Sequence, residues 1–205
     1  GYNGKFTANV GAQYSEKLHL GLNLNAHFID YDNYNILEES NTNGQSGNLH
    51  ITDINLENRL SAFGEGFSFQ LGTIAKLTDW LRFGITYDSP VWYTIKEETR
   101  QYLATRFIDQ SDEENTIVLD PNAINVFEEY TIETPSKITG SLAIIINKLG
   151  LISLDYSRKD YSKMEFRTSD EFEDSHFSDL NWAIYNNLTV ANSYKIGAEI
   201  RSNSM

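Results

Sequence analysis

Residues 5–28 read KFTANVGAQYSEKLHLGLNLNAHF, and this stretch decides the fold class. From Phe6 to Tyr14 every even-numbered residue is apolar or aromatic, and every odd-numbered residue is polar or glycine. The same rule holds from Leu18 to Phe28, after a short interruption. Alternation with a period of two is typical of a β-strand with two chemically different faces, whereas a helix would mix the two classes. The stretch therefore predicts two antiparallel strands joined by a tight turn.

The same alternation returns along the rest of the chain. It recurs in residues 67–76, 81–88, 137–146, 152–157 and 194–201. Together with the first hairpin, these stretches predict about seven strands, each with one apolar face and one polar face. The sequence thus predicts an all-β protein.

The connections between these strands alternate between short and long. The short ones are residues 16–17, 78–79 and 147–150, and the long, polar or acidic ones are residues 32–50, 99–127 and 168–179. Antiparallel strands that step up and down place all short turns on one side and all long loops on the other, as in outer-membrane barrels. We therefore predict an antiparallel transmembrane β-barrel of the outer membrane, with its long loops outside the cell.

Alternation alone does not show which face of the sheet points into the barrel. In a soluble, lipocalin-like binding protein the apolar face would point inward, and this alternative stays open. The sorting of the loops favours lipid on the apolar face. Because lipid tolerates no open sheet edge, the barrel must close. About seven strands make half of a mid-sized barrel, so we expect residues 1–205 to be one barrel segment of a longer protein.

Composition excludes several classes of function. The net charge is −13 and no basic face is visible, which excludes a nucleic-acid partner. The chain has no cysteine, which excludes disulfides and thiolate metal sites. Acidic residues gather in runs such as Asp109–Asn115, which lacks the glycine and the terminal glutamate of a calcium loop. We interpret these runs as solvated loops and predict no metal site.

Three stretches resemble a known family. Residues 72–95, GTIAKLTDWLRFGITYDSPVWYTI, contain a K-x-T turn and a strand that ends Y-x-S-P. Residues 130–166 open with TP-K and continue with GL-S-DY and DYS, and residues 194–201, YKIGAEIR, are similar to a later strand. On these motifs the chain resembles the FadL/TodX-type outer-membrane transporters of hydrophobic compounds, in a version most like those of Bacteroidetes-type bacteria.

The resemblance implies more than the alternation does. It implies a barrel of about fourteen strands, of which this chain would supply roughly half. It also implies an N-terminal hatch that plugs the barrel, and diffusion of fatty acids or other hydrophobic molecules. We expect the hatch and the remaining strands to lie outside this chain.

Pro90 falls inside the alternating stretch of residues 76–95. Proline cannot donate a ladder hydrogen bond, so it belongs at a strand end, an edge or a bulge. One interpretation places Pro90 at the end of the membrane-spanning part of the strand. The other makes it a kink in the barrel wall that opens a lateral exit for a ligand, as is thought to occur in the family.

The candidate ligand-binding residues lie on the predicted polar, lumen-facing side. They are Arg82, Asp88, Ile145 and Asp155. Ile145 is an apolar residue on a polar face, which suits a hydrophobic ligand beside the polar Asp155. Ion pairing that holds the lumen together is the alternative for the charged residues. His19 and His27 share one strand face but lie too far apart for one metal ion.

The sequence predicts no catalytic residues, no cofactor and no enzyme activity. The predicted function is passive uptake of hydrophobic small molecules, such as long-chain fatty acids, across the outer membrane of a Gram-negative bacterium. Expected partners are these molecules, membrane lipid and lipopolysaccharide. The alternative is a non-transporting barrel subunit of a larger outer-membrane secretion or assembly complex, such as the type 9 secretion system, with other outer-membrane proteins as partners.

Overall fold

The computed structural model describes residues 1–43, 50–108, 113–121, 123–147, 149–168 and 177–201. Among these residues the structure is all-β apart from one α-helix and one short 3-10 helix, which confirms the predicted class. In chain order the elements are β1 (Tyr2–Tyr14), β2 (Leu18–Ser40), β3 (His50–Lys76), β4 (Leu81–Asp88), β5 (Trp92–Ile108), β6 (Glu114–Leu119), β7 (Asn125–Val126), β8 (Tyr130–Glu133), β9 (Lys137–Ile146), β10 (Gly150–Asp160), η1 (Tyr161–Lys163), β11 (Glu165–Thr168), α1 (Ser178–Asn187) and β12 (Val190–Ile200).

The chain divides into two compact units. Unit 1 comprises Gly1–Asn3, Ile29–Gly64 and Lys96–Glu129, and unit 2 comprises Gly4–Phe28, Glu65–Ile95 and Tyr130–Met205. The long strands β2, β3 and β5 contribute residues to both units. All seven predicted strands fall in unit 2.

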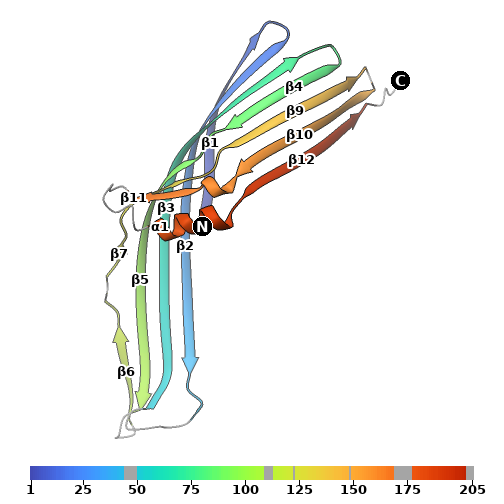
Figure 1. Ribbon diagram of the computed structural model, residues 1–205. Coiled ribbons are helices and arrows are strands. Elements are labelled where there is room, and N and C mark those ends of the chain that lie inside the picture. Colours follow the sequence, from blue (N-terminus) through green and yellow to red (C-terminus); the bar gives the residue numbers. More distant parts are fainter. Residues whose placement is uncertain (44–49, 109–112, 122, 148, 169–176, 202–205) are drawn as a thin grey trace. The chain divides into compact units, whose positions relative to one another are not determined.

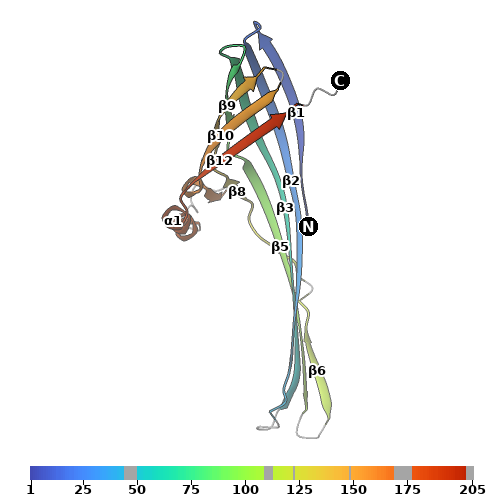
Figure 2. The same ribbon diagram turned by 90° about the vertical axis from the view of Figure 1, so that its right-hand side faces the viewer.

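The seven strands that the sequence predicts follow one another in the sheet in the order β1-β2-β3-β4-β9-β10-β12. Antiparallel registers join β3 to β4, β4 to β9, β9 to β10 and β10 to β12. Figures 1 and 2 show β9, β10 and β12 side by side. The three short connections are confirmed, and two of them contain a residue in the left-handed region, Ser15 with φ 61° and Asn147 with φ 45°.

This register gathers the apolar residues on one face of the unit 2 sheet. Phe83 lies opposite Leu142, Leu142 opposite Leu154, and Leu154 opposite Ile196. We call this side the apolar face. Its side chains are exposed on every one of the seven strands, as represented by Val10, Leu20, Leu71, Phe83, Leu142, Leu154 and Ile196. Monomeric soluble proteins rarely expose so wide an apolar surface, so something other than water must cover it.

The apolar residues are not buried elsewhere in the chain. Among the described residues the buried apolar side chains are those of Ile95, Pro135 and Ile184. Three polar side chains, those of Asn25, Ser68 and Ser89, are buried as well. A soluble barrel with its apolar face inward would bury mainly apolar side chains.

The sheet does not close within the described residues. β1 pairs only with β2, and β12 pairs only with β10. Both are therefore edge strands, and an edge strand in lipid would leave a row of backbone groups without hydrogen bonds. Closure of the barrel by further strands stays a prediction.

Three adjacent strands of unit 2 are interrupted next to one another. β4 passes into β5 through residues 89–91, and β8 passes into β9 through residues 134–136, while η1 separates β10 from β11. The first two interruptions are in contact, because the Thr134 N–H donates to the Val91 carbonyl at 3.0 Å and the Val91 N–H donates to Thr134 Oγ1 at 2.9 Å. On one side of this line β4 pairs with β9, and on the other side β5 pairs with β8.

Each of these two interruptions contains a proline, Pro90 or Pro135. The strand predicted at residues 81–88 is confirmed as β4, which stops before Pro90, and a new strand, β5, begins after it. At this point Ser89 forms the hydrogen bonds that hold the chain to β3. Its backbone N–H donates to the Phe69 carbonyl at 2.9 Å, and its Oγ accepts from the Phe69 N–H at 2.9 Å.

Two of the predicted long loops are wrong. Much of residues 32–50 and of residues 99–127 is strand, because β2 runs to Ser40, β5 runs to Ile108, and β6 and β7 both pair with β5. The prediction failed because these segments lack an apolar face. Sheet pairing needs only backbone partners and compatible side-chain pairs, and an apolar face is needed only where the sheet must be covered. Of the third loop, residues 168–179, residues 169–176 lie outside the described residues, and α1 begins at Ser178.

Polar cross-strand pairs take the place of apolar contacts in unit 1. Arg59 donates two hydrogen bonds to Asp32, at 2.7 and 3.0 Å, and the Tyr34 hydroxyl donates to Glu57 at 2.6 Å. The hydrogen bond from Arg59 lowers the pKa of the Asp32 carboxyl below its ordinary value. Each such exposed pair contributes little by itself, so the strands of unit 1 depend on many of them together.

A charge on the apolar face should disrupt assembly of the barrel. Leu22 lies near the middle of the apolar run of β2, and Asn23 is its neighbour on the opposite face. Leu22→Arg should destabilise the membrane-inserted protein by about 2–4 kcal/mol, measured by denaturant unfolding in lipid vesicles. Asn23→Arg should cost clearly less. Equal effects of the two substitutions would contradict a lipid-facing assignment of the apolar face.

Candidate functional site

The opposite side of the unit 2 sheet carries a network of hydrogen-bonded polar side chains, and we call it the polar face. Thr7 Oγ1 donates to Asn25 Oδ1 at 2.8 Å, and Asn25 Nδ2 donates to Ser68 Oγ at 3.2 Å. His27 Nε2 lies 2.8 Å from the same Ser68 Oγ. These contacts link β1, β2 and β3 through side chains, in addition to their backbone pairing. Asn25 is only 8% exposed, which is unusual for an asparagine and requires such partners.

A second row of polar side chains runs parallel to the first and crosses more strands. Asn23 Nδ2 donates to Gln70 Oε1 at 2.6 Å, and Gln70 Nε2 donates to Asp88 Oδ1. Asp88 Oδ2 then forms an ion pair with Lys137 Nζ at 2.8 Å. The row therefore connects β2, β3, β4 and β9 on one face.

Both rows border a hollow of about 210 Å³ on the polar face, at the line of strand interruptions. Its charged or titratable lining residues are Lys5, His27, Asp88, Lys137 and Lys159. Val91 and Pro135, from the two interruptions, give it an apolar edge. Convergent polar groups beside an apolar surface are the usual composition of a small-molecule site. We therefore take this hollow, called the polar hollow below, as the candidate functional site.

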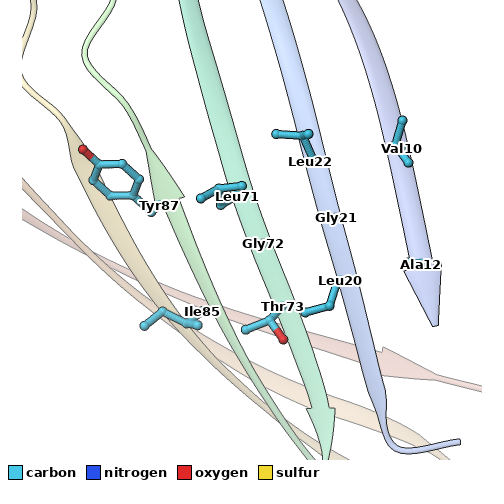
Figure 3. Close-up of a pocket in the computed structure, with 10 residues that line it drawn as sticks. All are labelled: Val10, Ala12, Leu20, Gly21, Leu22, Leu71, Gly72, Thr73, Ile85 and Tyr87. Carbon is cyan, nitrogen blue, oxygen red and sulfur yellow. The ribbon is translucent and has the colours of Figure 1, made fainter. Parts of the chain in front are cut away.

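A larger groove of about 490 Å³ lies on the apolar face. Figure 3 shows Val10, Leu22 and Leu71 side by side on β1, β2 and β3, with Ile85 and Tyr87 next to them. The lining is almost wholly apolar. Such a groove suits a hydrocarbon chain, and its lining provides no charged group that could bind a polar ligand.

Of the four predicted site residues, only Asp88 lines the polar hollow. Arg82 lies opposite Lys76 and Ala143, six positions from Asp88 along β4. Asp155 lies opposite Ser141 on β9 and Lys195 on β12.

The fold does not bring Ile145 and Asp155 into contact. Ile145 lies opposite Leu151, and Asp155 lies four positions further along β10. At about 3.4 Å for each residue, the two side chains are separated by roughly 13 Å along the strands. The sequence argument treated two residues on one face of one hairpin as neighbours, although the register separates them.

The structure adds functional candidates that the sequence argument missed. Lys137 and Lys159 are cross-strand partners on β9 and β10, and Lys5 borders the same hollow from β1. The sequence contains a signal for the first two, because each occupies a polar-face position at the end of an alternating stretch beside residues that interrupt the strand. Their pairing could have been predicted only from the register of the hairpin, by counting residues on both strands outward from the turn at residues 147–150.

His19 and His27 do not share a site, as expected from their spacing. His27 contacts Ser68 and lies with its Nδ1 3.5 Å from the Tyr93 hydroxyl, while His19 does not line the polar hollow. Over the described ranges, no group of three or more histidine, aspartate or glutamate residues could hold a metal ion. Residues 109–112 of the acidic run considered for calcium are outside these ranges.

Comparison with protein families and with curated proteins gives no match. Two solved structures are similar over 96% of this chain. The first, the CymD monoaromatic hydrocarbon channel, has a TM-score of 0.52 and 13% sequence identity, and the second, the toluene transporter TbuX of Ralstonia pickettii, has 0.51 and 16%. The fold is similar to about half of the β-barrel of such channels. Both neighbours are FadL-family channels, so the predicted resemblance is confirmed at the level of the fold.

The match covers 55% of CymD and 51% of TbuX, so the chain spans about half the length of these channels. This agrees with the seven strands of unit 2 and with their two edges. None of the helices in the described part of the chain is long and apolar enough to span a membrane.

The buried asparagine of the first polar row provides a test of the network. Asn25→Ala would remove the side-chain hydrogen bonds of Asn25 to Thr7 and to the buried Ser68, and hydrogen bonds of this kind each contribute about 0.5–1.5 kcal/mol. The free energy of unfolding should therefore fall by at least about 1 kcal/mol. Asn9→Ala, at an exposed position of β1, should change it by less than about 0.5 kcal/mol. A similar result for both variants would show that the row does not stabilise the sheet.

Proposed function

We propose that this chain is part of an outer-membrane β-barrel that allows passive uptake of hydrophobic small molecules. The observation that carries the proposal is the two-faced sheet of unit 2. An apolar face on seven strands suits contact with lipid, and a hydrogen-bonded polar face with a hollow suits the wall of an interior passage. The similarity to a monoaromatic hydrocarbon channel and a toluene transporter supports hydrophobic cargo. No step of this uptake needs energy coupling, since the cargo moves down its gradient.

Several finer points belong to the same proposal. Long-chain fatty acids are a candidate cargo alongside aromatic hydrocarbons. The protein resides in the outer membrane of a Gram-negative bacterium, where membrane lipid and lipopolysaccharide surround the apolar face. Residues 1–205 form a single barrel segment, and the hatch and the remaining strands come from other parts of the protein. Arg82, Asp88, Ile145 and Asp155 face the interior of the barrel.

The polar hollow is a plausible stopping point for cargo. It combines the ion pair of Asp88 and Lys137 with the apolar edge formed by Val91 and Pro135. A molecule with an apolar body and one polar group could use both surfaces. The hollow also borders the interrupted strands, so cargo held there lies against the part of the wall with the fewest backbone ladder bonds.

The uptake proposal is tested in cells with and without the full-length gene. Cells that carry it should take up labelled toluene or decanoate faster at low concentration than cells that lack it. Ile145→Asp should slow this uptake about tenfold, because a barrier increase of about 1.4 kcal/mol is enough for that change. Ile144→Val, on the opposite face of the same strand, should have no effect. Uptake that does not depend on the gene would refute the proposal.

A non-transporting subunit of a larger complex is the second candidate, and one observation favours it. Trp182 and Tyr185 lie three positions apart on α1 and are 69% and 71% exposed. Exposed tryptophan and tyrosine are enriched in protein interfaces. If the protein is such a subunit, the full-length protein should always co-purify with the same outer-membrane partner. The double variant Trp182→Ala, Tyr185→Ala should then lose that partner. A lone barrel after mild extraction would exclude it.

A further inference from the structure

A separate hollow of about 280 Å³ lies on the sheet of unit 1, and we call it the unit 1 hollow. Its lining residues are Tyr34 from β2, Glu57 and Arg59 from β3, and Arg100, Gln101 and Tyr102 from β5. β3 pairs with both β2 and β5, so these three strands lie side by side (Figure 1). Pockets for drug-sized ligands measure about 300–1,000 Å³, so this hollow has room for one small ring.

Two tyrosine side chains border the unit 1 hollow from the strands on either side of β3. They belong to Tyr34 on β2 and Tyr102 on β5. The Tyr34 hydroxyl donates to Glu57 at 2.6 Å, which restrains the ring, while the residue stays 54% exposed. The face of an aromatic ring carries partial negative charge and attracts C–H groups, which carry partial positive charge. Tyr34 therefore provides a restrained aromatic surface that a ligand can reach.

The polar groups beside this ring are only partly used by the protein. Arg59 donates its Nε and one Nη2 hydrogen to Asp32, and these are the hydrogen bonds that it forms with the described residues. Three of the five guanidinium N–H groups are then left for a ligand. Glu57 accepts the Tyr34 hydroxyl on Oε2, which leaves Oε1 as an acceptor. A donor and an acceptor on neighbouring side chains match a hydroxyl, which both donates and accepts.

The charges around the unit 1 hollow disfavour an anion. Arg59 is ion-paired with Asp32 at 2.7 Å, and Arg100 with Asp120 at 3.6 Å. Glu57 adds a negative charge to the two balanced pairs. The chain as a whole has a net charge of −13. A ligand that carries phosphate, such as a nucleotide, could stack on tyrosine but would be repelled here.

We propose that the unit 1 hollow binds a neutral hexopyranose unit of a carbohydrate. A pyranose combines the two features that the hollow matches, since its faces carry C–H groups and its rim carries hydroxyls. One face of the sugar ring lies against Tyr34, and hydroxyls on the rim bond to Arg59 and Glu57. The inference goes beyond the uptake of hydrophobic molecules and does not depend on it.

The first experiment compares a neutral sugar with its charged counterpart. The probes are methyl β-D-glucopyranoside and methyl β-D-glucuronide, which differ only in the carboxylate of the glucuronide. Binding is measured by NMR titration of the purified full-length protein in a detergent that carries no sugar group. The wild-type protein should bind the glucoside and should bind the glucuronide at least about fivefold more weakly, because the carboxylate meets Glu57 and the balanced pairs.

Three variants separate stacking from general effects on the fold. Tyr34→Ala should weaken binding of the glucoside about tenfold, whereas Tyr34→Phe, which keeps the ring, should stay within about threefold of wild type. Tyr31→Ala is the matched control, because Tyr31 is 46% exposed on the same strand and does not line the hollow. Residues three apart on a strand point to opposite faces, so this variant should bind the glucoside as the wild type does.

The same sugar chemistry occurs in the polysaccharide of the outer membrane itself and in free oligosaccharides. The wild-type protein is therefore also tested against lipopolysaccharide with and without its polysaccharide, and against cellotetraose. Binding only to the form with polysaccharide, lost in Tyr34→Ala, would assign the site to the cell's own surface. Binding only to cellotetraose, lost in the same variant, would assign it to free saccharides.

Several outcomes would overturn the inference. A wild-type protein that does not bind the glucoside has no such site. Tighter binding of the glucuronide would mean that the hollow takes anions. Equal losses in Tyr34→Ala and Tyr31→Ala would mean that the sugar contacts the sheet without using the hollow. Each of these results leaves the uptake proposal intact, since that proposal is tested by the dependence of uptake on the gene.

Discussion

The antiparallel register of unit 2 is the constraint on which the rest of the structure depends. Because β4, β9, β10 and β12 pair without a slip, nearly all large apolar residues of these strands lie on the same side, with Ile145 and its partner Leu151 on the other. A shift of one residue in any pair would turn a whole strand over and place its leucines and isoleucines among the lysines and serines. The short turns, with Ser15 and Asn147 in the left-handed region, set this register. The polar face then adds side-chain hydrogen bonds between strands that already share backbone bonds, such as those of Asn25 and Gln70.

The interruptions combine a fold feature with a functional one. Pro90 and Pro135 end two neighbouring ladders at the same place, and Ser89 and Thr134 supply hydrogen bonds there with their side chains. The polar hollow lies beside this line, and the lysines around it exceed the carboxylates. The sheet of unit 2 is therefore irregular beside the polar hollow. Irregular backbone in a sheet is tolerated where side chains compensate the lost hydrogen bonds, and Ser89 and Thr134 do so here.

The sequence pattern predicted the strands that have a clear apolar face and did not predict the others. The alternation of β1, β2 and β9 is strong because lipid-facing positions must be apolar. The period of the sequence pattern therefore shows directly which side chains face the lipid. The strand parts of unit 1 have polar residues on both sides, such as the successive Asp32 and Asn33, and nothing in their pattern separates them from loops. The polar hollow was missed for a different reason. Lys137 and Lys159 are 22 positions apart, and only the register of the hairpin makes them neighbours.

The most direct test of the account is the direction of the two faces in the membrane. The chain has no cysteine, so single cysteines can be placed in turn at Ser141, Leu142, Ala143 and Ile144 of the full-length protein. Labelling with a charged, membrane-impermeant thiol reagent would then be measured in isolated outer membranes made accessible from both sides. The account predicts alternation, with positions 141 and 143 labelled and positions 142 and 144 protected by lipid. Labelling of 142 and 144 with protection of 141 and 143 would mean that the apolar face points inward, and would contradict the membrane barrel.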